Sequence, residues 1–291
     1  MPFQNPFDAT IVDTDYGPVQ YSDEGGGSPV LFIHGSPGGF DQGTLMARFL
    51  LERGHRIIAI SRPGYLGTPL SGSNDTLGAQ ADLAGALMDS LGIERFALAC
   101  WSGGGPSSYH LAAAHPDRVS ALVAVAAVSK PYTFEDPKEE EFLFGRFGTW
   151  LGRELVRHAP RSVVKMLVSE EGDLDRNQAR ELVEKIWDAP DRRRFALDLM
   201  DTIVGDRRAG FENDVRQFPN IDLDLPSIDT RTLLVHATAD ADVPIEHSEN
   251  ALASLPHADI IRIEDDTHLS AWTEPGSEVV RARIADFVAT P

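Results

Sequence analysis

A serine among glycines at the end of an apolar run constrains the fold of this 291-residue chain more than any other feature. Residues 95–100 predict a buried strand and residues 107–115 a helix, and the intervening Trp-Ser-Gly-Gly-Gly-Pro must turn sharply between them. Only small residues two positions before and after Ser102, here Cys100 and Gly104, let the strand and helix approach each other. The pattern predicts a nucleophile elbow, with the Ser102 hydroxyl at the carboxyl edge of a sheet.

Two plainer interpretations compete with the elbow. One is a glycine-rich turn that happens to contain a serine, and the other is a loop that binds phosphate at a helix N-terminus. A phosphate loop calls for a Gly-Lys-Ser/Thr ending or a Gly-x-Gly-x-x-Gly spacing, and this turn has neither. The elbow therefore needs a base, an acid and an oxyanion hole from elsewhere in the chain.

Strand and helix patterns alternate along most of the sequence. Short strands are predicted over 9–14 and 17–21, and buried strands over 29–33, 56–60, 119–125, 231–236 and 259–263. Helices are predicted over 42–51, 76–91, 247–255 and 277–288. This alternation predicts an α/β fold whose mostly parallel sheet is covered by helices on both faces.

The alternation stops in the middle of the chain. From about residue 131 to about 226 the pattern is helical, with bulky apolar residues and punctuating prolines, and a strand pattern returns only at 231–236. We expect a core domain formed by residues 1–130 and 227–291, and a helical cap formed by 131–226 over the carboxyl edge of the sheet. A separate helical domain is the alternative.

Composition narrows the class of protein. The chain has 26 basic and 45 acidic residues, a net charge of −19, which disfavours nucleic acids and anionic membranes as partners. Neither a membrane-spanning apolar run nor a secretion signal is evident, so we expect a cytoplasmic protein. The single cysteine, Cys100, excludes an internal disulfide and a cysteine-built zinc site.

Nine histidines compete for the role of the base that would activate Ser102. Most fall in helix ends or connecting loops, where a solvated histidine is the common case. His268 follows the last predicted strand, and in a parallel sheet that loop emerges at the same edge as Ser102. We predict that His268 is the base.

The acid that orients His268 is expected in the loop after the preceding strand, at 236–244. A carboxylate there can fix the imidazole tautomer and stabilise the imidazolium. Asp240 is the first choice, Asp242 the alternative and Asp266 a more distant one. The aspartate that is not used would serve ordinary turn chemistry.

An oxyanion hole needs two backbone N–H groups that point to one place. Gly103, at the start of the elbow helix, is expected to supply one. The other is expected from Ser36 in the His-Gly-Ser-Pro-Gly-Gly loop, because Pro37 has no N–H. His34 is interpreted as an anchor of this loop and not as a catalyst.

With these pieces placed, the chain resembles the α/β-hydrolase superfamily from Pro29 to the end, and within it the capped, esterase-like serine hydrolases. The motifs that carry this resemblance are residues 34–39, 61–65, 100–106, 240–244 and 267–268. The resemblance implies Ser102, Asp240 and His268 as a catalytic triad, with Ser36 and Gly103 as oxyanion donors.

The predicted reaction is hydrolysis of small to medium uncharged carboxylic esters through an acyl-enzyme, with no metal and no organic cofactor. The same triad also fits carbon–carbon bond, peptide, amide or lactone hydrolysis, and a ligand-binding receptor on this scaffold is an alternative of another class. The oligomeric state stays open. Aromatic residues are candidates to bind the small-molecule substrate, namely Trp101, Phe142, Phe147 and Trp150, with Phe144 and Trp187 as further candidates.

Overall fold

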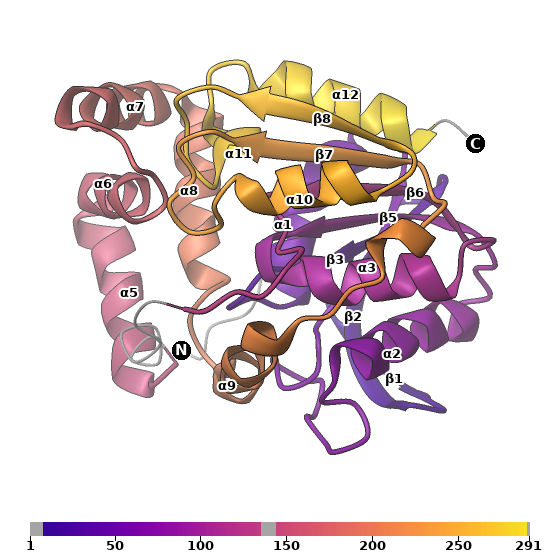
Figure 1. Ribbon diagram of the computed structural model, residues 1–291. Coiled ribbons are helices and arrows are strands. Elements are labelled where there is room, and N and C mark those ends of the chain that lie inside the picture. Colours follow the sequence, from indigo (N-terminus) through magenta and orange to yellow (C-terminus); the bar gives the residue numbers. More distant parts are fainter. Residues whose placement is uncertain (1–7, 135–143, 290–291) are drawn as a thin grey trace.

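The computed structural model describes residues 8–134 and 144–289, and its centre is an eight-stranded sheet (Figure 1). The strand order is β1-β2-β4-β3-β5-β6-β7-β8. The strands are β1 Thr10–Thr14, β2 Gly17–Glu24, β3 Pro29–Ile33, β4 Arg56–Ile60, β5 Phe96–Trp101, β6 Val119–Val125, β7 Thr232–Ala237 and β8 Ala258–Ile263.

Strands β3 to β8 run parallel to one another, whereas β1 and β2 add an antiparallel edge. The central strand β5 is buried at every residue, as its continuous apolar run predicts. Parallel strands end at one edge, so the loops after β3, β5, β7 and β8 meet there. The predicted α/β class and its mostly parallel sheet are confirmed.

Helices cover both faces of the sheet. On one face α1 (Phe40–Leu51) and α12 (Ser277–Ala289) bury their apolar sides, together with short α11 (Ser270–Thr273). On the other face lie α2 (Leu77–Ser90), α3 (Gly105–Ala114) and α10 (Glu246–Ser254). Both cores are closed by strand side chains that alternate between the faces, such as Phe32 toward the first and Ile33 toward the second.

The segment between β6 and β7 is helical and stands beside the carboxyl ends of the strands (Figure 1). Its helices are α5 Arg146–His158, α6 Pro160–Glu170, α7 Arg176–Asp188, α8 Pro190–Asp201 and α9 Arg208–Gln217, followed by two 3₁₀ turns, η2 Phe218–Asn220 and η3 Leu225–Ser227. Pro160 and Pro190 each begin a helix, where a missing N–H costs nothing. We call residues 144–227 the helical insertion.

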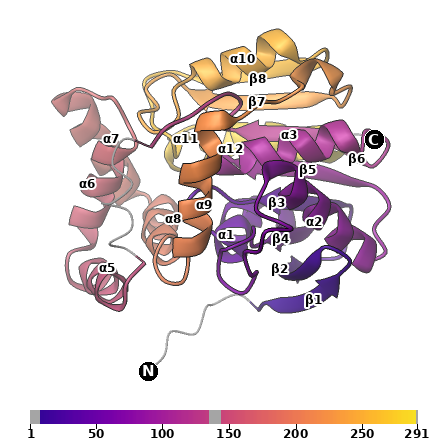
Figure 2. The same ribbon diagram turned by 60° about the horizontal axis from the view of Figure 1, so that its bottom comes forward.

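Two buried ion pairs fasten the insertion to the sheet layer. Arg207 pairs with Asp41 of α1 at 2.6 Å, and Asp214 of α9 pairs with Arg62 at 2.7 Å. All four side chains are 5% exposed or less. Figure 2 shows α9 between the outer helices of the insertion and the sheet, where these contacts form. Across residues 8–134 and 144–289 no helix is both long and apolar enough to cross a lipid bilayer.

Candidate active site

The turn at Ser102 has the backbone strain that an elbow requires. Ser102 adopts φ 50°, a left-handed conformation that non-glycine residues rarely take, at the start of a 3₁₀ turn, η1 (Ser102–Gly104). A Cβ on Gly104 would lie 2.5 Å from the carbonyl oxygen of Ile33. Only glycine therefore allows β3 and the elbow to approach this closely, and the buried side chain of Cys100 is accommodated on the strand side.

Asp240 and His268 form a buried pair at the same edge. Nδ1 of His268 donates to Oδ2 of Asp240 at 2.7 Å, and neither side chain is exposed. The other oxygen, Oδ1, accepts the backbone N–H groups of Asp242 (3.1 Å) and Val243 (2.9 Å). Nε2 of His236 lies 3.1 Å from Oδ2. The carboxylate is thus fixed from four directions and holds the imidazole in one orientation.

The imidazole of His268 packs against the residue that precedes the elbow serine. The rings of Trp101 and His268 are 4.8 Å apart, and the Trp101 indole N–H donates to the backbone oxygen of His268. Within the described part of the chain, Nε2 of His268 makes no hydrogen bond, and Oδ2 of Asp242 lies 3.2 Å from it. The structure therefore brings His268 beside the elbow, with Asp242 next to the nitrogen that would face Ser102.

A third carboxyl group reaches this site from the insertion. Glu171 directly follows α6, and its backbone oxygen accepts the N–H of His268 at 2.9 Å. The next residue, Gly172, forms an antiparallel β-bridge with Asp240. Sequence reasoning missed Glu171, because it lies in a helical region with no strand pattern and only the folded chain places it at the sheet edge.

The close packing of these groups shifts their pKa values. Burial alone would lower the pKa of His268, but Asp240 and Asp242 reverse this effect and raise it to about 10. Burial alone would raise the pKa of Asp240, yet His268 and His236 hold it below its usual range. Burial raises the pKa of Glu171 to about 8 and also raises that of Asp242. Perturbed groups of this kind cluster at functional sites.

The loop after β3 brings a backbone N–H toward the elbow. The amide nitrogen of Ser36 lies 3.2 Å from the point where a Cβ on Gly103 would stand. The Ser36 hydroxyl hydrogen-bonds with the Tyr65 hydroxyl at 3.0 Å. The structure thus places the two predicted oxyanion donors side by side.

His34 and Gln42 hold the same loop in shape. Nδ1 of His34 hydrogen-bonds with the backbone oxygen of Gly35, and Nε2 accepts the N–H of Arg62. Burial, and then the charge of Arg62, lower the pKa of His34 well below its usual range. Oε1 of Gln42 accepts the N–H of Gly35 at 2.9 Å. With both ring nitrogens engaged by backbone, His34 is an anchor of this loop.

The two alternative acids are placed differently from Asp240. Asp242 lies at Nε2 of His268, and the Tyr132 hydroxyl donates to its Oδ1 at 2.9 Å. Asp266 accepts the N–H of Thr267 at 2.7 Å, which is turn chemistry. Only Asp240 hydrogen-bonds with Nδ1, the nitrogen that an orienting acid must hold.

The predicted substrate-binding aromatics are scattered. Trp101 is buried against His268, but Phe147 and Trp150 on α5 are 61% and 55% exposed and pack against each other. Their exposure argues against a pocket role, because side chains one turn apart on an outer helix face solvent together. Phe142 lies outside the described residues. Phe144 packs against Phe211.

Other aromatic rings, not predicted from sequence, lie nearer the elbow. Cε2 of Phe218 is 3.3 Å from the position of a Cβ on Gly103, and the rings of Phe134 and Phe218 stack at 5.7 Å. Tyr132, which contacts Asp242, packs edge to face on Phe134. Tyr132 and Phe134 precede the insertion and Phe218 lies near its end, so their proximity depends on how the insertion folds back.

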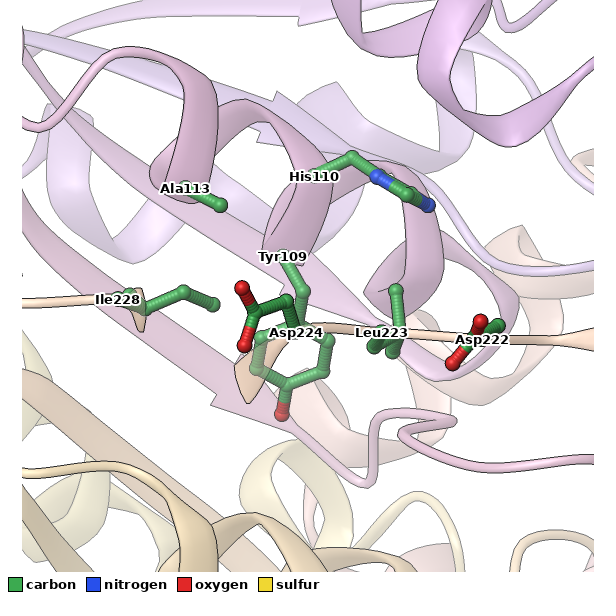
Figure 3. A pocket seen from close by; sticks show the side chains of 7 residues that line it. All are labelled: Tyr109, His110, Ala113, Asp222, Leu223, Asp224 and Ile228. Carbon is green, nitrogen blue, oxygen red and sulfur yellow. The ribbon is translucent and has the colours of Figure 1, made fainter. Parts of the chain in front are cut away.

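A cavity of about 440 Å³ lies elsewhere, between α3 and the segment that leads to β7. It is lined by Tyr109, His110, Ala113, Asp222, Leu223, Asp224 and Ile228 (Figure 3). None of the triad candidates contributes to it, and burial lowers the pKa of His110. This cavity is therefore separate from the chemistry at the sheet edge.

Comparison with known proteins agrees with this architecture. Residues 28–275 match the family described as the alpha/beta hydrolase fold. A solved alpha/beta hydrolase fold protein from Nakamurella multipartita is 44% identical, with a TM-score of 0.92 over 97% of this chain and 99% of that chain. An uncharacterized hydrolase of Bacillus subtilis is 28% identical over 249 residues, 81% of this chain and 83% of its own.

A solved esterase from Exiguobacterium antarcticum shares the fold, with a TM-score of 0.69 at 19% identity over 97% of this chain and 99% of that chain. The family match spans strands β3 to β8, the elbow and the loops that carry Asp240 and His268. Because its strand order and its strained serine turn agree with that match, the chain belongs to the alpha/beta hydrolase family.

Proposed function

We propose that the protein is a serine hydrolase that cleaves small to medium uncharged carboxylic esters through an acyl-enzyme. The observation that carries this proposal is the Asp240–His268 hydrogen bond of 2.7 Å beside the strained elbow of Ser102. A buried carboxylate on Nδ1 leaves Nε2 as the nitrogen that exchanges protons with the nucleophile.

In the proposed reaction, Nε2 of His268 takes the proton of the Ser102 hydroxyl as the oxygen attacks the ester carbonyl. The N–H groups of Ser36 and Gly103 stabilise the oxyanion of the tetrahedral intermediate. The intermediate collapses as the alcohol leaves with the proton from His268. Water, activated by the same imidazole, then hydrolyses the acyl-enzyme and returns Ser102 to its starting form.

The charges at the site favour a neutral substrate. Asp240, Asp242 and Glu171 surround one imidazole, and the whole chain has a net charge of −19. An anionic substrate would be repelled at long range and at the site. The rings of Phe218 and Tyr132 beside the elbow offer an apolar surface to an acyl or alcohol group.

We propose further that the insertion is a cap over this site. The contacts at 171–173 support this role, since Asp173 donates its N–H to the oxygen of Ala239 at 2.9 Å and Gly172 pairs with Asp240. A cap that contacts the loop of Asp240 limits the space for substrate and excludes water.

The test combines turnover of a short-chain nitrophenyl ester with labelling by a fluorophosphonate probe. We expect Ser102→Ala to abolish labelling and to lower kcat by about 10⁶-fold. Ser107→Ala is the matched control, because Ser107 is a buried serine of α3 whose hydroxyl donates only a long hydrogen bond, 3.4 Å, to the backbone oxygen of Gly104. Retention of most turnover in Ser102→Ala would show that another residue is the nucleophile. A protein that neither turns over nor labels would fit the receptor alternative.

A panel of substrates decides which bond is cleaved. An ester, a lactone, an amide, a peptide and a β-diketone are offered at equal concentration, and kcat/KM is compared. We expect the uncharged ester to have the highest value, and a higher value for the diketone would favour carbon–carbon bond hydrolysis by the same residues.

A further inference from the structure

The carboxyl group of Glu171 enters the site with one oxygen that no described residue hydrogen-bonds. The backbone contacts of residues 171 and 172 with His268 and Asp240 fix where this side chain begins. Its Oε2 is buried and makes no hydrogen bond within the described residues. A buried carboxyl oxygen without a partner is costly, and a cation bound at this point would satisfy it.

Three ligand atoms converge here. One atom each from Glu171, Asp242 and His268 lies within 4.8 Å of the other two. The His268 side chain is fully buried, and none of the described residues forms a hydrogen bond with its Nε2. The Tyr132 hydroxyl holds Oδ1 of Asp242, which leaves Oδ2 directed toward the imidazole at 3.2 Å.

From this geometry we propose that Glu171, Asp242 and Nε2 of His268 form a binding site for a zinc-like divalent cation. An imidazole nitrogen with two carboxylate oxygens is a ligand set that suits Zn²⁺, which binds these atoms at about 2.0–2.2 Å in a tetrahedron. Ligand atoms in such a tetrahedron lie about 3.4 Å apart. Rotation of the Glu171 and Asp242 carboxylates would bring their oxygens and Nε2 of His268 to this separation. Mg²⁺ and Ca²⁺ prefer oxygen ligands alone.

The residue behind the imidazole strengthens the proposal. Metal-binding histidines donate their other ring N–H to a carboxylate, which fixes the tautomer and makes the binding nitrogen more basic. Asp240 has this position, with its Oδ2 at 2.7 Å from Nδ1. The three protein ligands would leave one position of the tetrahedron for water.

Binding of the cation has a direct consequence for catalysis, and this consequence rests on the proposed function. A cation on Nε2 occupies the lone pair that must take the proton of Ser102. Cation binding and ester hydrolysis therefore exclude each other, and the site is an inhibitory one.

Isothermal titration calorimetry with ZnCl₂ tests the site independently of activity. We expect one Zn²⁺ to bind the wild-type chain and Ser102→Ala equally, since Ser102 is not a ligand. Glu171→Gln and Asp242→Asn should each weaken binding by at least about 100-fold. Glu170→Gln, a change at the exposed neighbouring residue, is the matched control and should bind like the wild type. MgCl₂ in place of ZnCl₂ should give no comparable binding.

Titration of ester turnover with ZnCl₂ tests the inhibition. We expect turnover to be lost at the ZnCl₂ concentration that saturates the calorimetric site and to return when a chelator is added. In Glu171→Gln, inhibition should need a ZnCl₂ concentration that is higher by the same factor as the loss of affinity. Absence of one-to-one binding, or binding that neither Glu171→Gln nor Asp242→Asn weakens, would overturn the site. Turnover that survives a saturated site would overturn the inhibition. If no ester is hydrolysed, the proposed function fails, whereas calorimetry on Ser102→Ala still decides the metal site.

Discussion

Two clusters of charge join the insertion to the rest of the molecule, and they are built in opposite ways. In the first, Arg62 meets Asp214 and Arg207 meets Asp41, so each carboxylate has its own guanidinium. The second cluster gathers Asp240, Asp242 and Glu171 around the single imidazole of His268. We call these the anchor cluster and the site cluster.

The difference shows what each cluster contributes. Nη1 and Nη2 of Arg62 donate to the two oxygens of Asp214, at 2.8 and 2.7 Å, and the Tyr65 hydroxyl donates to the same carboxylate. Nε of Arg62 is the one nitrogen of this guanidinium for which the described residues supply no hydrogen bond. The paired charges still rigidify the structure around them, here the loop that carries Ser36. In the site cluster, Nε2 of His268 and Oε2 of Glu171 receive no hydrogen bond from residues 8–134 and 144–289. Its unmet polar atoms are available for chemistry and ligands.

The largest effect should come from breaking the site cluster at Asp240. We expect Asp240→Asn to lower the acylation rate by about 10⁴-fold, because an amide on Nδ1 favours the wrong tautomer of His268. The pre-steady-state burst with a nitrophenyl ester measures this rate. Asp242→Asn is the matched control and should lower the acylation rate by less than about 10-fold. A larger loss from Asp242→Asn than from Asp240→Asn would exchange the roles of the two residues.

Substitutions in the anchor cluster should lower the stability of the fold. We expect Asp214→Asn to lower the free energy of unfolding by about 3–5 kcal/mol, because Arg62 would keep a buried charge without its counterion. Urea denaturation followed by tryptophan fluorescence measures this change. The double variant Arg62→Met/Asp214→Leu should recover part of the loss, since it removes both charges. An Asp214→Asn protein as stable as the wild type would contradict the role of this pair.

A smaller effect is expected on the pH dependence of the site cluster. His268 faces Asp240, Asp242 and Glu171, and after burial, which lowers its pKa, the first two carboxylates are the main causes that raise it. Removing the charge of Asp242 makes the imidazolium lose its proton more readily. The acid limb of the kcat/KM profile should therefore move to lower pH, by about one unit, in Asp242→Asn. A limb that stays in place or moves to higher pH would show that Asp242 does not act on the base.

The site cluster also shows how far sequence reasoning can go. The alternation of strands and helices predicted the sheet. Because loops after parallel strands must meet at one edge, Ser102, Asp240 and His268 could be proposed as a triad from the sequence. Glu171 could not be, because its place depends on how a helical insertion without strands folds back. Its contacts with His268 and Asp240 are tertiary, and no local pattern encodes them.

The aromatic residues and the anchors illustrate the same limit. Phe147 and Trp150 have the spacing of one helix face, which fits a pocket and an exposed surface equally well, and the structure exposes them. Phe218 was not singled out, although it contacts the elbow. Arg207 and Asp214 look like solvated charges in sequence, yet both are buried by pairing across about 150 residues or more. Periodicity predicts which face is apolar but not which element will cover it.

The smallest expected effect comes from a surface pair with the same geometry as the Arg62–Asp214 anchor. Nε and Nη2 of Arg56 donate to the two oxygens of Asp23 at 2.8 and 2.7 Å, but the side chains are 30% and 29% exposed. Water can solvate either partner when the other is removed, so Asp23→Asn should cost less than about 1 kcal/mol in the same urea experiment. The donor geometry is nearly the same in the two pairs. The difference between the losses of unfolding free energy in Asp23→Asn and Asp214→Asn therefore measures how much burial adds to the cost of removing the carboxylate. Equal losses in the two variants would mean that geometry, and not desolvation of the remaining arginine, sets the stability of the anchor cluster.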